Sequence, residues 1–506
     1  MPYSPVVPGQ ARLSSGCGDE PCLPPLTPLK RPPSQQVVSV TETDKCRRDS
    51  DTARFLRILI APAAIFGSSF SLALQFVLLT PLATSLGVSS SAASLVWLMG
   101  PVTGMLVQPL MGDLSDRYHR KHATRLPIVI YASSILAISH IGIAFCCSIS
   151  AVVPVPPLVT LIASFWMLDA ANNVITLTMR AMLSDRFGRD HRTLAFSMLQ
   201  FWTSLGYIAG YFVANIDWGG GDLVHNVTCS FLCSAFTVVA GSALSAISVF
   251  EKRACRMRFH TIQTGAKFSF SSCLEPCLIS ILAGSILTWF GWFSQQVFQS
   301  NFVGSRVIHE PSPAIAVQVT AYGLVISSVL SCLTGIFVIP WLLAYAGTSS
   351  FILFRVWAVS SMLQGLNLLM SPFVKTIPGA VLWEASTGPM YAVSLTVPFM
   401  LVANGCDHGS SGRVMALVNV AVCIPQLFVS LGGGVIIACT RSVVAIFIIG
   451  GVLCLLATYF LWVPSGEELP GWATRSTASI IASTSDLFTM FEESEVSFRE
   501  PLIRNT

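Results

Sequence analysis

Residues 93–149 decide the fold of this chain. They read ASLVWLMGPVTGMLVQPLMG (93–112), then DLSDRYHRKHATR (113–125), then LPIVIYASSILAISHIGIAFCCSI (126–149). Two apolar stretches of about 20 residues, the length that a helix needs to cross the hydrocarbon core of a bilayer, enclose a short charged segment. This pattern is typical of two membrane-spanning helices that are joined by a loop at the membrane surface.

The same pattern recurs along the chain. Of its 506 residues, 53% are hydrophobic and only 11% are charged, whereas roughly 25% of a typical soluble domain is charged. We therefore predict an all-α membrane protein with twelve transmembrane helices in two six-helix halves. The predicted spans are 56–80, 93–112, 126–149, 158–182, 193–214, 227–250, 276–300, 315–339, 351–372, 378–403, 414–434 and 442–462.

The remaining segments give the domain organisation and the orientation. Lys and Arg gather in the connectors after spans two, four and six, and the connectors after spans one, three and five contain none. By the positive-inside rule, the two ends of the chain and its centre lie in the cytoplasm. The predicted parts are a disordered tail (1–54), the first half (55–250), a basic connector (251–275), the second half (276–463) and a second disordered tail (464–506).

Several classes of function are disfavoured by the sequence. The 15 cysteines lack metal-type spacing, so we predict no metal site. No nucleophile and base constellation or phosphate-cradling loop stands out, so we expect neither an enzyme nor a cofactor. The net charge of +4 sits in short clusters, unlike a nucleic-acid footprint. Asn226 starts an Asn-Val-Thr sequon in a predicted outer connector and is a candidate glycosylation site.

The charged connector after span two, GDLSDRYHRK (112–121), resembles the loop signature of the major facilitator superfamily. A carboxylate beside guanidinium groups can clamp two helix bundles together in one state and release them in another. We predict that Asp116, Arg117, Arg120 and Lys121 form such a gate. The alternative is a charged loop that only sets orientation, which leaves Asp116 unexplained. No matching copy follows span eight, so the predicted gate is asymmetric.

Span four keeps charges where a bilayer disfavours them. An ionisable group at mid-bilayer costs about 2.5 to 3.5 kcal/mol even on lenient scales. Asp169 and Arg180 are eleven residues apart, close to three helical turns, and Asn172 and Asn173 lie beside Asp169. Such a face must point at a water-filled cavity or at polar partners. We predict that Asp169 binds a proton and that the other three contact substrate; the alternative is a structural ion pair between helices.

Uncharged polar and aromatic residues complete the predicted cavity. Amides can hydrogen-bond hydroxyl groups, and an indole face can stack on the apolar face of a sugar ring, which suits a neutral polyol. We predict further substrate contacts from Gln75, Gln299 and Trp292, although a packing role is the alternative for any tryptophan. Arg355 and Glu384 are weaker candidates, because each lies near the end of its span.

Several longer stretches are similar to the sucrose transporters of the glycoside-pentoside-hexuronide cation symporter group. They are LALQFVLLTPLATSLGV (72–88), VWLMGPVTGMLVQPLMGDLSDR (96–117), LDAANNVITLTMRAMLSD (168–185), LTWFGWFSQQVFQ (287–299) and ALVNVAVCIPQLFVSLGGG (416–434). The resemblance implies twelve spans, proton-coupled uptake of sucrose or a related glucoside such as maltose, and a mechanistic Asp and Arg in span four. These two fall on Asp169 and Arg180.

The chain departs from that family in the first outer loop and at the end of span seven. Ser90 replaces a histidine, and Gln299 and Asn301 stand where the family has two aspartates. Amides keep hydrogen bonding but cannot take up a proton, so Asp169 has to carry more of the coupling.

We therefore expect a secondary active transporter of a neutral sugar that works by alternating access, with protons as the coupling ion. Its partners are the sugar and the lipid bilayer, with no nucleic acid. The plasma membrane is the expected location, with an internal membrane as the alternative. Two other functions stay open: a sensor that binds sugar without turnover, and an uncoupled facilitator.

Overall fold

The computed structural model describes residues 51–88, 98–187, 189–219, 222–250, 275–308, 313–346, 350–405 and 411–462. The predicted tails and the predicted central connector lie almost wholly outside these ranges, as does Ser90. Helix α1 (Asp51–Ile60) takes in the last residues of the predicted N-terminal tail, and α11 begins at Glu275.

The first half forms one helical run for each predicted span. Span one is α1, α2 (Ala64–Leu74), the π-helical η1 (Gln75–Leu79) and α3 (Thr80–Ser85). The others are α5 (Met99–His122), α6 (Leu126–Ala144) with α7 (Cys146–Val152), α8 (Pro157–Arg186), α9 (Arg189–Ala214) and α10 (Leu223–Phe250).

The second half repeats this arrangement. Its runs are α11 (Glu275–Phe302) with η2 (Val303–Ile308), α12 (Pro313–Leu333) with η3 (Thr334–Val338) and α13 (Ile339–Ala346), α14 (Ser350–Leu369) with η4 (Ser371–Phe373), α15 (Ile377–Ala385) with α16 (Gly388–Gly405), α17 (Ser411–Thr440) and α18 (Val444–Trp462). Each of the twelve predicted spans thus overlaps a helical run, and the all-α fold is confirmed. The connector 113–125, predicted as a loop, is instead helical as far as His122 at the end of α5.

Ten of the described helical runs are long and apolar enough to cross a membrane by length and composition. The two that fall short are α5 and α9. Helix α5 carries Gln108, Asp113 and Asp116, and α9 begins with Arg189 and Asp190. Both helices pack against the other half, α5 on α17 and α9 on α12, so protein covers part of their polar surface.

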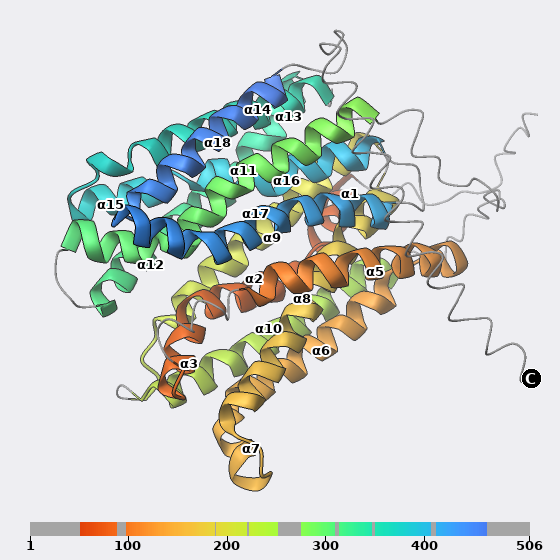
Figure 1. Cartoon of the computed structure of the whole chain (residues 1–506). Helices are drawn as coiled ribbons and strands as arrows, with labels where there is room; N and C mark the ends of the chain where they lie inside the picture. Colours follow the sequence, from red (N-terminus) through yellow and green to blue (C-terminus); the bar gives the residue numbers. More distant parts are fainter. Residues whose placement is uncertain are drawn as a thin grey trace, which may run out of the picture. The chain divides into compact units, whose positions relative to one another are not determined.

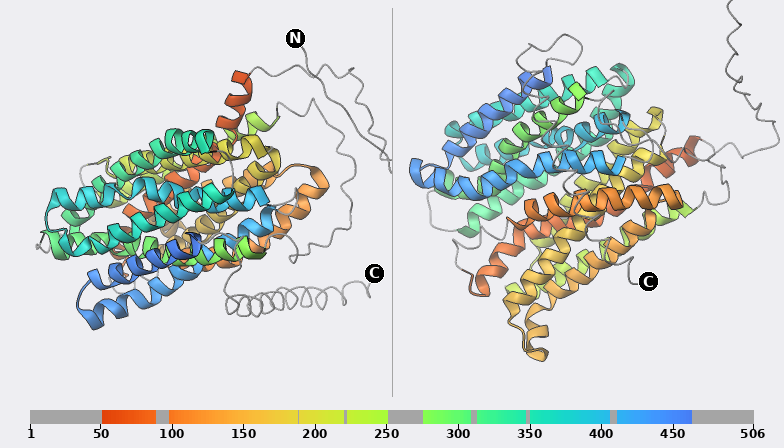
Figure 2. Two further views of the ribbon diagram at one scale, coloured as in Figure 1. Left: turned by 90° about the horizontal axis from the view of Figure 1, so that it is seen from above. Right: turned by 45° about the vertical axis from the view of Figure 1, so that its right-hand side comes forward.

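Figure 1 shows the helices of residues 51–250 (red to yellow-green) on one side and those of residues 275–462 (green to blue) on the other. Inside the first half, α2 packs on α9 and α10, and α6 packs on α8 and α10. Inside the second, α18 packs on α11 and α14, and α12 packs on α15. The two further views in Figure 2 show the same lengthwise packing of the helices.

Several predicted spans are interrupted in the structure, including 56–80 at residues 61–63 and 351–372 at Met370. Two further breaks lie in the spans 126–149 and 378–403. The predicted span 126–149 ends as a helix at Ala144, and α7 starts after Phe145. The predicted span 378–403 breaks at Ser386 and Thr387, between α15 and α16. Discontinuous helices in transporters occur where backbone groups line a cavity. The second break therefore marks a place to look for a binding site.

Candidate functional site

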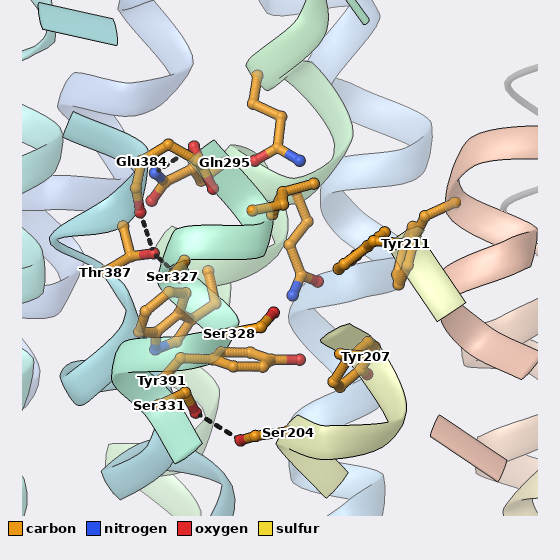
Figure 3. A pocket seen from close by; sticks show the side chains of 15 residues that line it. Ser204, Tyr207, Tyr211, Gln295, Ser327, Ser328, Ser331, Glu384, Thr387 and Tyr391 are labelled. Carbon is orange, nitrogen blue, oxygen red and sulfur yellow. Dashed lines mark hydrogen bonds between the residues drawn. The ribbon is translucent and has the colours of Figure 1, made fainter. Parts of the chain in front are cut away.

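A cavity lies between the two halves, and α9, η1, α11, α12, α15 and α16 supply its walls (Figure 3). Its lining is rich in hydroxyl, amide and aromatic side chains with one carboxylate. The lining residues are Phe76, Ser204, Tyr207, Tyr211, Trp292, Gln295, Gln296, Gln299, Leu324, Ser327, Ser328, Ser331, Glu384, Thr387 and Tyr391. Such a lining offers many hydrogen-bond partners and flat apolar faces to a small polar molecule.

Aromatic rings surround Tyr391 at one side of this cavity. The ring centroid of Tyr391 lies 5.0 Å from that of Trp292, 6.3 Å from that of Trp289 and 6.4 Å from that of Tyr207. The Trp292 indole donates to Ser394 Oγ at 3.1 Å, which fixes the orientation of the ring. The aromatic faces are therefore held in place before any ligand binds.

A carboxylate and two amides form the polar side of the cavity, and a third amide lies behind them. Glu384 is buried, and its Oε2 accepts a hydrogen bond of 3.2 Å from Gln295 Nε2. Oriented with its nitrogen toward the carboxylate, the Gln299 amide donates to Oε1 at 2.9 Å and to Oε2 at 3.2 Å. Gln364 Nε2 donates to Gln295 Oε1 at 2.8 Å. None of the described residues forms an ion pair with Glu384.

The break between α15 and α16 holds this carboxylate at the cavity. Thr387 Oγ1 donates to the backbone carbonyl of Glu384 at 2.6 Å and lies 2.9 Å from Ser327 Oγ. Gly388 starts α16 where a Cβ would overlap the carbonyl oxygen of Ser327 in α12. Glycine is needed at this close approach, which binds the broken helix to its neighbour.

Asp169 lies in a second polar cluster, between α5 and α8. Its Oδ2 accepts a hydrogen bond of 2.5 Å from Thr103 Oγ1. Asn173 Nδ2 donates to the backbone carbonyl of Asp169 at 2.9 Å, and Gln108 Nε2 donates to Asn173 Oδ1 at 2.8 Å. Asp169 is buried, and its carboxylate forms no ion pair with any residue that the structure describes. The alternative role, an ion pair between helices, is not found at Asp169 among the described residues.

Arg180 lies nearer the C-terminal end of α8. Its guanidinium carbon sits 3.6 Å from the centre of the Phe399 ring, which belongs to α16 in the other half. This cation–π contact bridges the halves, and the buried Arg180 Nε has no hydrogen-bond partner among the described groups. Arg180 therefore retains unused donor capacity next to the contact between the halves.

The predicted substrate residues divide between these clusters. Gln299 and Trp292 line the cavity, whereas Gln75, Asn172, Asn173 and Arg180 do not. Gln75 Nε2 donates to Ser71 Oγ at 3.3 Å, inside the first half. Asn172 Oδ1 accepts from Ser68 Oγ at 2.8 Å.

Two other candidates lie away from the cavity. Arg355 stacks on the Phe351 and Trp462 rings, at centroid distances of 4.8 and 3.9 Å. Asn226 lies in the first turn of α10, and its Oδ1 accepts from the backbone N–H of Trp218 at 2.8 Å.

A network around Asp116 joins the halves at the end of the bundle that the sequence predicts to be cytoplasmic. Arg125 Nη2 lies 2.6 Å from Asp116 Oδ1, and both side chains are fully buried. Across the interface, the first backbone N–H groups of α17 donate to the same carboxylate: Gly412 to Oδ1 at 2.9 Å and Arg413 to Oδ2 at 3.0 Å. A carboxylate at a helix N-terminus accepts hydrogen bonds from backbone N–H groups that have no partner within the helix, and its charge interacts favourably with the helix dipole.

Other residues extend this gate network. Asp185 accepts from Arg125 Nε at 2.7 Å and from Ser411 Oγ at 2.8 Å. Asp113 pairs with Arg413 of the other half and with Arg117 of its own helix, the latter at 2.5 Å. Of the four predicted gate residues, Asp116 therefore contacts the other half directly and Arg117 shares Asp113 with it. Arg120 and Lys121 are exposed.

Charge at Asp113 persists at the pH of any cell. Burial raises the pKa of this carboxyl, but the Arg413 and Arg117 guanidiniums lower it more, so the net pKa lies below the ordinary value of 3.8. A carboxyl with a lowered pKa stabilises the paired state fully at pH values above its ordinary pKa. This stabilisation is lost only as the pH falls through the lowered pKa.

The partner of Asp116 was not predicted from the sequence. Ser411, Gly412 and Arg413 start α17, nearly 300 residues after the predicted gate. A short span-initial Ser-Gly-Arg carries no motif that identifies it as a partner. Only Arg125 and Asp185, which lie in the charged connectors after spans two and four, were marked by the charge pattern of the sequence.

Known proteins that are similar to this chain in sequence include sucrose transport proteins. No family model matches the chain. It is similar to the sucrose transport protein SUC4 of Arabidopsis thaliana, with 28% identity over 75% of this chain and 84% of that protein. It is also similar to the sucrose transport protein SUT5 of Oryza sativa subsp. indica, with 26% identity over 85% of this chain and 90% of that protein.

Solved structures share the fold. The major facilitator proton:xylose symporter XylE, bound to 6-bromo-6-deoxy-D-glucose, matches 81% of this chain and 96% of that protein with a TM-score of 0.55 and 14% identity. The major facilitator transporter FucP in an outward conformation matches 80% of this chain and 97% of that protein, with a TM-score of 0.57 and 12% identity. The chain is thus a multi-pass membrane protein that is similar in sequence to sucrose transport proteins and shares the fold of the major facilitator transporters.

Proposed function

We propose that this protein is a secondary active transporter that carries a neutral sugar, such as sucrose, maltose or a related glucoside, together with protons. The observation that carries the proposal is the cavity between the halves, where fixed aromatic faces oppose amides and hydroxyls. A sugar ring presents the complementary surfaces, apolar on its C–H face and hydroxylated around its edge. The names of the relatives support the same class of substrate.

Alternating access requires that the two halves close on one side at a time. Polar contacts between the halves gather at the cytoplasmic end, around Asp116, and near midspan, where Gln200 Nε2 donates to Ser331 Oγ at 3.0 Å. Arg192 adds a contact by donating to the backbone carbonyl of Ala403. These contacts bar the cytoplasmic route to the cavity. Rocking of one half against the other would break them and open that route.

Proton coupling needs an ionisable group that is buried and is not neutralised by a fixed cation. Asp169 meets this requirement, because its carboxylate accepts from Thr103 and pairs with no described cation. Its helix, α8, also packs on α16 and α17 of the other half. Protonation of Asp169 removes a buried charge and so changes the relative free energies of the two packings.

The test is uptake of labelled disaccharide by proteoliposomes with and without an inward proton gradient. We expect accumulation above the outside concentration only when the gradient is present. Uptake that is equal in both conditions would replace symport by facilitated diffusion.

Counterflow tests the remaining alternative. Saturable binding of sugar without exchange of labelled for unlabelled sugar would replace transport by sensing. Exchange together with gradient-driven accumulation supports the symporter.

A further inference from the structure

Glu384 has the surroundings of a titratable ligand group rather than those of a structural ion pair. Its side chain is buried in the wall of the cavity and receives amide hydrogen bonds only, from Gln295 and Gln299. A buried carboxylate without a cation is expensive in the ionised form and is stable when protonated. Glu384 lies at a break in a transmembrane helix, where the Thr387 hydroxyl donates to the backbone carbonyl of Glu384.

The neighbouring elements supply no described cation that could neutralise it. Helix α12 offers Tyr322, which is exposed, and η2 offers Arg306, whose side chain is also exposed. On α14, Arg355 is engaged with Phe351 and Trp462. Across the cavity lie the phenols of Tyr207, Tyr211 and Tyr391, with Arg180 beyond them over Phe399.

We propose that Glu384 is a second proton-binding group of the transporter and that its protonation is linked directly to sugar binding through Gln295 and Gln299. This inference rests on the proposed function. The two amides spend N–H donors on the ionised carboxylate at 2.9 to 3.2 Å. Once the carboxyl takes a proton from water, those donors are released and can bind sugar hydroxyl oxygens.

Gln364 fixes the orientation of the Gln295 amide during this exchange of hydrogen-bond partners. Its Nε2 holds Gln295 Oε1 at 2.8 Å, so the Gln295 amide cannot turn over without losing a hydrogen bond. The Gln295 N–H groups must therefore face the carboxylate or the cavity. Sugar and the ionised carboxylate compete for the same donors, so sugar should bind better to the protonated form.

Asp169 is a separate site in this account. It lies on α8 of the first half and binds Thr103, whereas Glu384 lies on α15 of the second half and binds Gln295. Among the described residues, each half then carries one buried carboxylate that forms no ion pair, because the buried Asp116 pairs with Arg125. Two protons should enter with each sugar, one on each half.

The experiment measures protons taken up on sugar binding, with purified protein in a weakly buffered solution that contains a pH indicator. Disaccharide is added to wild type, Glu384→Gln, Asp169→Asn and the control Asp222→Asn. Asp222 is exposed at the outer end, and asparagine can keep its bond to Val224 N–H. We expect Glu384→Gln and Asp169→Asn each to take up half as many protons as wild type, and the control to match wild type.

The pH dependence of sugar affinity gives the second readout. Wild-type affinity should fall as the pH rises, and the Glu384→Gln affinity should fall less. Glu384→Asp, which keeps a carboxyl, should restore the wild-type proton uptake and guards against a folding defect in the Gln variant. Equal proton uptake by Glu384→Gln and wild type would overturn the inference while leaving Asp169-coupled transport intact. Wild-type protein that binds no sugar would instead overturn the proposed function.

Discussion

Asp169 and Arg180 share a helix face but not a bond. Thr103 holds the Asp169 carboxylate, and Phe399 of the other half holds the Arg180 guanidinium. Their spacing of eleven residues, about 16 Å along the axis, already separates them too far for direct pairing. Each is therefore available for a different part of a transport cycle, the carboxylate for a proton and the guanidinium for the contact between the halves.

Replacing Asp169 by asparagine should weaken the coupling of transport to protons without stopping transport. The asparagine Oδ1 can still accept the Thr103 hydrogen bond, so the fold should survive, but the group can no longer bind a proton. We expect the gradient-driven accumulation ratio to fall by about tenfold, within the usual range of coupling energies. Sugar counterflow in the same proteoliposomes should persist. Accumulation at the wild-type level would exclude Asp169 as a coupling group.

The sequence predicted which kinds of side chain form the site better than it predicted which individual residues do. Gln299 and Trp292 line the cavity, on a helix with a dense run of polar and aromatic residues, and their contact with substrate stays a prediction. The sequence made Glu384 only a weak candidate, because a carboxyl near the start of a span can reach the membrane–water interface. The break at Ser386 and Thr387 instead keeps its side chain in the cavity wall. No local sequence pattern specifies that break, because Gly388 acts through a contact with α12.

At the scale of elements, the junction of α5 with α17 depends on one buried carboxylate. Removing one partner of a buried ion pair costs about 3 to 5 kcal/mol, whereas an exposed pair contributes about 0 to 1 kcal/mol. Asp116→Asn should therefore loosen the α17 N-terminus, and Asp113→Asn should do so much less. Hydrogen exchange at the Gly412 and Arg413 amides, followed by mass spectrometry, measures this directly. Equal exchange in both variants would contradict the gate assignment.

The contact of α16 with α12 makes a second prediction at this scale. An alanine Cβ at Gly388 would overlap the Ser327 carbonyl, and overpacking of this kind costs about 1 to 3 kcal/mol. Gly388→Ala should lower the thermal unfolding temperature in detergent and weaken sugar binding. Gly432→Ala is the matched control, because no atom lies within 4 Å of a Cβ at that position. A Gly388→Ala protein as stable as this control would remove the close approach from the account.

At the scale of the whole molecule, the helical runs follow from the apolar stretches, because each run must satisfy its backbone hydrogen bonds within the bilayer. The pairing of the halves follows from contacts between residues far apart in the chain. Asp116 with Gly412 and Arg180 with Phe399 are examples. Such pairs leave no local pattern in the sequence. Only the half of the gate that contains the charged motif at 112–121 could therefore be predicted.

The central claim is that sugar and protons cross together through the cavity between the halves. The most direct measurement uses proteoliposomes that contain a pH-sensitive dye and no imposed proton gradient, to which disaccharide is added outside. Sugar moving down its own gradient should draw protons inward and acidify the lumen, and Asp169→Asn should acidify it less. Sugar entry without any change in lumenal pH would contradict the account.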